Sequence, residues 1–284
     1  MLLARRADAL KKVADACTDA HKGTGVQGGG KVATIQIDVS DKAQVSGILS
    51  KIPDELKSID VLGAHDIWCS FHAVFTSRPA VNNAGYVLGT ERIGQISSDD
   101  IEGMFNTNVF GLINMTQAFV NGAPPRIWAG NLETHTRPEM KARNTGHVIN
   151  IGSVAGREPY IGGSIYCATK YAVRAFTGAL LRELVETQVR VTEIQPGMVE
   201  TEFSIVRYRG DKDAADKVYQ GITPRTFSTV QTIPEAAKFS PVTADDVAEE
   251  IVWAASRPPH VNIAELFIMP TNQAAPWLAY RSNK

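Results

Sequence analysis

The stretch from residue 147 to residue 196 constrains the fold more than any other part of the chain. Residues 147–152 form a short apolar run that predicts a buried strand, and residues 164–187 predict a long helix. Residues 189–195 are rich in β-branched side chains and end at Pro196, which predicts a second strand. Because a strand, a helix and a strand at this spacing form a βαβ unit, the two strands are expected to run parallel. We therefore expect an α/β fold on a doubly wound parallel sheet.

Tyr166 and Lys170 lie four residues apart in the predicted helix, so their side chains share one face, one turn apart. A free phenol has a pKa of about 10, and a nearby ammonium group lowers that pKa by favouring the phenolate. The pair can then act as a general acid and base near neutral pH. Ser153 follows the predicted strand 147–152, where its hydroxyl can orient a substrate oxygen. The three side chains indicate proton transfer coupled to hydride transfer; the alternative is a half-buried core tyrosine.

The length of 284 residues fits one large α/β domain, or at most two small ones. The net charge of −1 gives no electrostatic basis for binding nucleic acid or an anionic membrane. The three cysteines and six histidines have no disulfide or metal-ligand spacing, which predicts reduced thiols, a cytoplasmic protein and no metal site. No apolar run is long enough to cross a bilayer.

Further elements are expected on both sides of the βαβ unit. The predicted helices and strands are helices at 7–20, 41–57, 98–120, 202–220 and 243–256, and strands at 32–37, 59–62 and 262–269. Thr243 is expected to cap the last helix, which has acidic residues in its first turn. Residues 23–28 match the Gly-x-Gly-x-x-Gly fingerprint by letter, but a helix precedes them and a strand follows. The fingerprint requires the opposite order, so we interpret this segment as a loop.

Several motifs, in their order and spacing, resemble the short-chain dehydrogenase/reductase family from residue 1 to about residue 276. Beside Ser153, Tyr166 and Lys170, they are Asp38-Val39, Asn82-Asn83-Ala84-Gly85, Asn108 and Pro196-Gly197-Met198-Val199-Glu200-Thr201. Residues 156–163, 201–204, 206–210 and 270–273 resemble the branch of NADP-dependent 3-hydroxy acid dehydrogenases, which includes enzymes that oxidise serine and allo-threonine. The resemblance implies a Rossmann-like fold, NADP as cofactor, a small 3-hydroxy acid or related alcohol as substrate, and a homodimer or homotetramer.

The resemblance also implies roles for single residues. Tyr166 would move the proton, Lys170 would lower its pKa and contact the nicotinamide ribose, and Ser153 would bind the substrate oxygen. Asn108 would hold a water next to Lys170; the alternative is a helix residue that caps a turn. The implied cofactor contacts are Arg5, Arg6, Asp38, Val39, Asn82, Ala84, Gly85, Tyr166, Lys170, Pro196, Gly197, Val199 and Thr201.

Four arginines are candidates for binding anionic groups of the cofactor or the substrate, and each has an alternative without a ligand. Arg5 and Arg6 sit where the family's second strand ends, so they would pair with a ribose 2′-phosphate and favour NADP. The alternative is a solvated basic pair at the start of a helix. Arg207 or Arg209 would bind a substrate carboxylate through two parallel hydrogen bonds, and the alternative is an arginine that faces solvent.

The chain departs from the family at its start and in three segments. The first strand and the glycine-rich phosphate loop have no counterpart, so the middle of the sheet is expected to lack a strand. Residues 63–80, 121–137 and 225–241 are expected to be irregular insertions, because removing each one restores the family pattern. Our hypothesis is that they are translated introns in a faulty gene model; a transcript that retains all three would contradict it.

Two other functions were compared with the dehydrogenase. The first is a catalytically impaired relative, a binding or regulatory protein, or the product of a defective gene model that does not bind the cofactor. The second is a serine hydrolase, but Ser153 lies in Gly-Ser-Val-Ala-Gly rather than in a Gly-x-Ser-x-Gly elbow, and no histidine is placed to serve it. The sequence therefore favours the dehydrogenase and disfavours the hydrolase.

Overall fold

The centre of the protein is a parallel sheet in the order β2-β1-β3-β4-β7-β8-β9. The structure, a computed structural model, describes residues 1–22, 32–53, 63–64, 79–121, 127–128, 131–132, 140–219 and 241–280. Every pairing in this sheet is parallel. The strands are β1 (Leu2–Ala4), β2 (Thr34–Gln36), β3 (Gly63–Ala64), β4 (Pro79–Asn82), β7 (Gly146–Ile151), β8 (Val189–Pro196) and β9 (Glu265–Ile268).

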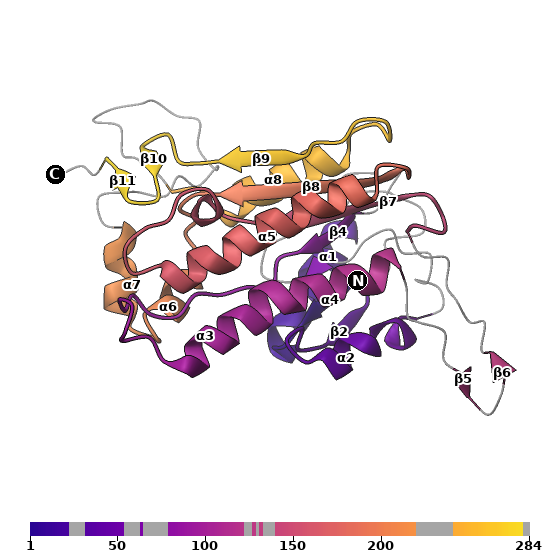
Figure 1. The fold of residues 1–284 in the computed structure, drawn as a ribbon, viewed down its shortest axis with the longest axis horizontal. Coiled ribbons are helices and arrows are strands. Elements are labelled where there is room, and N and C mark those ends of the chain that lie inside the picture. Colours follow the sequence, from indigo (N-terminus) through magenta and orange to yellow (C-terminus); the bar gives the residue numbers. More distant parts are fainter. Residues whose placement is uncertain are drawn as a thin grey trace.

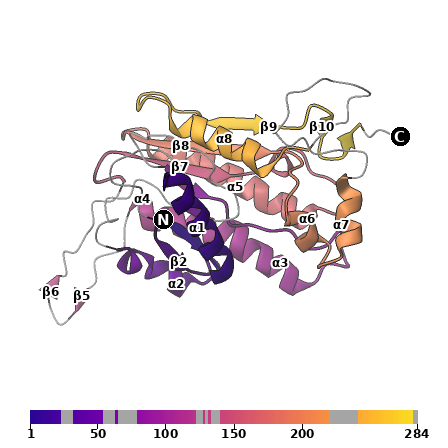
Figure 2. The same cartoon turned by 180° about the vertical axis from the view of Figure 1, so that it is seen from behind.

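Helices cover both faces of the sheet. The helices are α1 (Ala7–Lys22), α2 (Lys42–Ser46), α3 (Ser98–Phe105), α4 (Leu112–Val120), α5 (Ser164–Glu183), α6 (Phe203–Arg207), α7 (Lys212–Tyr219) and α8 (Ala244–Ala255). Short turns of other helical types are Ile48–Lys51, Asn106–Gly111 and Val154–Gly156. Helices α4 and α5 lie in front of the sheet in Figure 1, whereas α1 and α8 lie in front of it in the reverse view of Figure 2. The predicted doubly wound architecture is therefore confirmed.

Two apolar cores lie on the two faces, and the alternation of side chains along the central strands fills both. Val148 of β7 and Val191 of β8 belong to the core that also contains residues of α2, α4 and α5. Ile149 and Ile194, the neighbouring apolar residues on the same strands, belong to the core beneath α8. The βαβ unit predicted from residues 147–195 thus supplies apolar side chains to both faces of the sheet.

The middle of the sheet is occupied, so the expectation that it would lack a strand is wrong. Gly63 pairs with Leu2 of β1 on one side and with Val81 of β4 on the other. The backbone groups of β1 and β4 need hydrogen-bond partners in the interior, and two residues of the segment 63–80 supply them. The interpretation of 63–80 as irregular is therefore wrong for β3 and for the start of β4.

Of the other expected elements, the helix at 41–57 is the short helix α2 followed by the 3-10 turn Ile48–Lys51, and residues 54–57 lie outside the described residues. The helix expected at 98–120 is α3 and α4 joined by the π-helical turn Asn106–Gly111. Residues 121–137 contain a short antiparallel pair, β5 (Ile127–Trp128) with β6 (Asn131–Leu132), where an irregular segment was expected. The helix expected at 202–220 is two helices, because Arg209 and Gly210 adopt positive φ angles of 55° and 92° and end the first one. Thr243 caps α8 in a capping box with Asp246, as predicted. Outside the described residues lie the strand expected at 59–62, the loop at 23–28 and nearly all of 225–241.

The C-terminal part of the described chain adds a hairpin of β10 (Gln273–Ala275) and β11 (Leu278–Ala279). Among the described residues, no helix combines the length and the apolar character that crossing a membrane requires.

His147 on β7 makes the stability of the fold sensitive to acid. The side chain is buried, and its Nε2 lies 2.7 Å from Thr192 Oγ1. Burial, assisted by the charge of Arg190, lowers the pKa of His147 to about 3, against about 6.5 in an unfolded chain. As the pH falls from 6.5 towards 3, His147 therefore becomes protonated in the unfolded state but stays neutral in the native state. Stability is lost in that window.

We expect this one group to remove about 3 kcal/mol of unfolding free energy between pH 7 and pH 4. Urea unfolding of the chain and of a His147→Gln variant at both pH values measures the contribution. The glutamine variant should lose clearly less stability over the interval, because its side chain does not titrate. Identical losses in the two proteins would show that other groups cause the acid sensitivity.

Candidate active site

The predicted site residues collect along one edge of the sheet, because parallel strands all end on the same side. Segments with predicted site residues begin within two positions of the strand ends: Arg5-Arg6 after β1, Asp38-Val39 after β2, Asn83-Ala84-Gly85 after β4, Ser153 after β7 and Gly197 after β8. Open α/β sheets bind ligands at this carboxyl edge. The structure therefore brings together residues that lie up to about 200 positions apart in the chain.

Ser153, Tyr166 and Lys170 meet at the centre of this edge, and all three are buried. Lys170 Nζ lies 5.8 Å from the centroid of the Tyr166 ring and donates a hydrogen bond of 2.9 Å to the carbonyl oxygen of Ile151. Ser153 caps the turn that follows β7 by accepting from the amide of Ala155 at 3.1 Å. The Ser153 hydroxyl lies close enough to Tyr166 to lower its pKa. The predicted trio is thus a contact cluster.

The electrostatics of the cluster differ from the expectation. Burial raises the pKa of Tyr166 well above its usual value, and the nearby Tyr160 acts in the same direction, while the Ser153 hydrogen bond and the charge of Arg207 oppose the rise. Burial also lowers the pKa of Lys170 to about 8, against a smaller opposite effect of the Glu193 carboxylate. The expected fall in the Tyr166 pKa is therefore wrong for this structure, because the loss of solvent on burial outweighs the lowering effects of Ser153 and Arg207.

Asn108 lies in the π-helical turn Asn106–Gly111 between α3 and α4, a backbone form that is often found at functional sites. Its Oδ1 accepts from the amide of Tyr86 at 2.9 Å, and its Nδ2 donates to the Tyr86 carbonyl at 2.9 Å and to Thr169 Oγ1 at 3.1 Å. Gly85 lies between Asn108 and Lys170: a Cβ there would be 3.2 Å from Asn108 Oδ1 and 3.7 Å from Lys170 Nζ. The buried amide therefore joins the loop after β4 to α5 beside the lysine.

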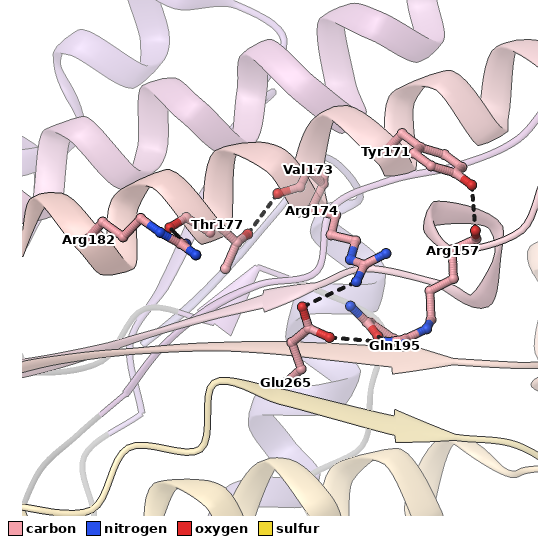
Figure 3. Close-up of polar contacts among 9 residues, drawn as sticks. Arg157, Tyr171, Val173, Arg174, Thr177, Arg182, Gln195 and Glu265 are labelled. Atoms are coloured by element: carbon pink, nitrogen blue, oxygen red, sulfur yellow. Dashed lines mark hydrogen bonds and ion pairs between the residues drawn. The ribbon is translucent and has the colours of Figure 1, made fainter.

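Asn82 is held inside the protein. Its Nδ2 donates to Thr116 Oγ1 at 3.1 Å and to Asn150 Oδ1 at 2.8 Å. Asn150 Nδ2 in turn donates to Thr177 Oγ1 at 2.9 Å, and Thr177 donates to the Val173 carbonyl (Figure 3). This chain of hydrogen bonds joins β4, β7, α4 and α5 behind the site. Asn150 was missed in the sequence, although an asparagine inside an apolar strand is itself a signal of a buried polar contact.

Arg157 fastens the segment that follows Ser153. Its guanidinium donates to Gln195 Oε1 at 2.6 Å and to Glu265 Oε2 at 3.0 Å, and Tyr171 donates to its carbonyl oxygen (Figure 3). Arg174, one turn after Lys170 on α5, lies 3.5 Å from the same Glu265 carboxylate. The turn that carries Ser153 is therefore tied to α5, β8 and β9 at once. These contacts were not predicted, because their partners lie on elements distant in sequence.

The loop after β8 is anchored at its base. The Gly197 amide donates to the Ile268 carbonyl at 2.7 Å, and the Met198 amide donates to Gln273 Oε1 at 2.8 Å. A Cβ at Gly197 would overlap Gln273 Oε1, so glycine permits this close approach. Thr201 Oγ1 accepts from the Phe203 amide at 3.2 Å, and the Phe203 ring meets the Tyr166 ring edge-on at 5.6 Å. The loop thus leads from the end of β8 to the tyrosine.

Val199 and Val39 are placed by packing. Val199 forms an isolated bridge with Val242, and Val39 is buried against Gly111, which leaves no room for a side chain at that glycine. Asp38 accepts from the amide and the hydroxyl of Ser40 and lies 3.9 Å from Arg5 Nη1. Both valines and Asp38 therefore belong to the backbone that frames the carboxyl edge.

The other three arginines have different surroundings. Arg6 donates from Nη1 and Nη2 to Glu202 Oε2, each at 3.1 Å. Arg207 is half-buried: its Nη1 donates to the Tyr160 hydroxyl at 3.1 Å, and its guanidinium lies 5.2 Å from the centroid of that ring. Arg209 is exposed and pairs with Asp100 at 2.7 Å and with Glu91 at 3.3 Å. Of Arg207 and Arg209, only Arg207 lies beside Tyr160 and acts on the pKa of Tyr166.

A doubly wound parallel sheet with a buried serine, tyrosine and lysine at its carboxyl edge defines a class, the α/β oxidoreductases that use a dinucleotide. The family model described as short chain dehydrogenase matches residues 1–124 and 130–211. The chain belongs to the short-chain dehydrogenase family.

Similar proteins agree with this assignment. The chain is 35% identical over 250 residues to an NADP-dependent 3-hydroxy acid dehydrogenase of Schizosaccharomyces pombe, covering 88% of this chain and 76% of the relative. It is 39% identical over 240 residues to a protein of the same name from Escherichia coli, with coverage of 84% and 76%. Among solved structures, the closed form of a serine dehydrogenase complexed with NADP⁺ matches with a TM-score of 0.71 and 34% identity, covering 99% of this chain and 89% of that one.

Proposed function

We propose that this protein is an NADP-dependent oxidoreductase that transfers a hydride between the nicotinamide and a small 3-hydroxy acid or related alcohol. The buried contact cluster of Ser153, Tyr166 and Lys170 carries the proposal. The relatives named as 3-hydroxy acid dehydrogenases support the substrate class, and the neighbour solved with NADP⁺ supports the cofactor. Assembly into a homodimer or homotetramer stays a prediction.

The residues along the carboxyl edge fit the cofactor. Arg6 already holds an anion, the Glu202 carboxylate, through two Nη donors, which is the contact that a 2′-phosphate would make. In the proposal, Arg5 and Arg6 bind the phosphate and Asp38 and Val39 flank the adenine side. The remaining contacts come from Ala84, Gly85, Lys170, Pro196, Gly197, Val199 and Thr201. NADP, when bound, accepts or donates the hydride.

In this mechanism the protein moves the proton. Ser153 hydrogen-bonds the substrate oxygen, and the Tyr166 hydroxyl beside it donates the proton in reduction and accepts it in oxidation. Burial keeps the phenol protonated in the structure, which suits the donor role. The charge of Arg207 favours the phenolate that the oxidation direction requires. Lys170 lies against the ring, and Asn108 holds the neighbouring loop.

Arg207 is the proposed contact for the substrate carboxylate. It is half-buried beside Tyr160, and its Nε has no hydrogen-bond partner among the described residues. A half-buried guanidinium with a free N–H can donate hydrogen bonds to a planar anion such as a carboxylate. Arg209 is the matched comparison, since it lies two residues away and is engaged by two surface carboxylates.

We therefore expect 3-hydroxypropionate to be oxidised with a kcat/KM at least about 10-fold above that of 1-propanol, which lacks the carboxylate. An Arg207→Met variant should lose that preference, and an Arg209→Met variant should retain it. Formation of NADPH, followed by absorbance, measures all three proteins. Equal rates with both substrates, or an equal loss in both variants, would contradict the assigned substrate class.

A further inference from the structure

One ion pair joins the two ends of the proposed cofactor site. Arg6 follows β1 at the proposed phosphate end, and Glu202 follows Thr201 in the loop proposed to contact the nicotinamide. The residues are 196 positions apart in the chain, yet both Nη atoms of Arg6 donate to Glu202 Oε2 at 3.1 Å. Both side chains are largely exposed, at 54% and 71%. The contact is therefore available to solvent and to ligands.

We propose that Glu202 is a specificity-determining residue, whose carboxylate occupies Arg6 in the free protein and is exchanged for the 2′-phosphate when NADP binds. The inference rests on the proposed function, in which Arg6 binds that phosphate. Glu202 itself makes no contact with the cofactor in this scheme. It acts as a competitor for the Arg6 donors.

The chemistry of the pair supports an exchange. A carboxylate and a phosphate both accept hydrogen bonds from the guanidinium fork, so they compete for the same two donors. A phosphate monoester carries about −1.5 to −2 charges near neutral pH, which favours it over a single carboxylate charge. A solvent-exposed ion pair contributes little, so its loss should change binding by only about 2- to 5-fold. NAD has no 2′-phosphate and leaves Glu202 in place.

The position of Glu202 connects this exchange to the substrate side of the site. Glu202 immediately precedes α6, which begins at Phe203 and ends at Arg207. Phe203 packs against Tyr166, and Arg207 contacts Tyr160. The ion pair therefore joins the start of α6 to the end of β1, next to the segment that carries both of these contacts.

Fluorescence titration of the full chain with NADPH and with NADH tests the proposal. Glu202→Gln keeps the size of the side chain and removes its charge, so it should tighten NADPH binding about 3-fold and leave NADH binding unchanged. Glu249→Gln is the control, because it removes the charge of an exposed carboxylate on α8, outside the proposed site. That variant should bind both nucleotides as the unmodified chain does. The difference between Glu202→Gln and the unmodified chain should shrink at high salt.

A double-mutant cycle separates this proposal from the proposed function. Arg6→Ala should weaken NADPH binding, and adding Glu202→Gln to it should change nothing further, since the competing contact is already gone. Equal dissociation constants for the unmodified chain and Glu202→Gln would overturn the role of Glu202 and leave the proposed function standing. An equal gain for NADH would overturn that role as well. Failure of every protein to bind NADPH would overturn both.

Discussion

Replacing Tyr166 by phenylalanine is expected to lower kcat about 10²- to 10⁴-fold and to leave NADP binding unchanged. The substitution removes only the hydroxyl that Ser153 contacts, so the proton has no donor at the substrate oxygen. The ring stays, and its edge-on packing against Phe203 at 5.6 Å is retained. Steady-state rates with 3-hydroxypropionate, together with a fluorescence titration of NADPH, measure the two properties separately.

Tyr171→Phe is the matched control for this experiment. Tyr171 lies on the same helix, but it is half-exposed and donates to the carbonyl of Arg157 rather than to the tyrosine cluster (Figure 3). We expect its kcat to fall less than about 3-fold, since a single exposed hydrogen bond contributes little. A Tyr166→Phe protein that kept the turnover of the Tyr171→Phe protein would remove Tyr166 from the mechanism.

Replacing Asn150 by leucine is expected to destabilise the fold by about 2–4 kcal/mol, one of the larger effects available to a single substitution here. Leucine has the same branched shape but is larger, and it removes an acceptor from Asn82 and a donor from Thr177. Both partners are buried, so neither can form a hydrogen bond with solvent water instead. When a buried polar group loses its hydrogen-bond partner, the unfolding free energy falls by the full cost of desolvating that group.

Urea unfolding measures this effect, and Asn121→Leu provides the comparison. Asn121 is exposed at the end of α4, so the same chemical change there should alter stability by less than about 0.5 kcal/mol. If both variants unfolded at the same urea concentration as the parent, the hydrogen-bond chain from Asn82 to Val173 would have no net role in stability. A selective loss at Asn150 would show that the layer behind the site is held by polar contacts as well as by its apolar cores.

Local patterns were enough to predict the parts of the fold that depend on local spacing. The βαβ unit at 147–195 follows from the alternation and length of its apolar runs, and the capping of α8 by Thr243 follows from a single side chain next to an acidic turn. The shared face of Tyr166 and Lys170 was predictable for the same reason, because a spacing of four residues on a helix places two side chains on one face whatever surrounds them.

Contacts between distant segments were beyond the reach of the pattern. The occupant of the central sheet position, β3, depends on which stretch of backbone meets the open groups of β1 and β4. In the sequence, Asn150 is a single polar residue in an apolar strand, and only the fold brings Asn82 and Thr177 beside it. The Arg6–Glu202 pair joins residues that are 196 positions apart in the chain.

The sequence by itself determined the α/β class, the family resemblance and the placing of Tyr166 and Lys170 on one face of a helix, because each of these depends on the spacing of residues along the chain. Tertiary structure alone decided how these residues ionise and which partners they bind. Burial raises the pKa of Tyr166 and lowers that of Lys170, and burial is a property of the packed elements around a side chain. The same packing brought Arg6 to Glu202 and turned Asn82 inward.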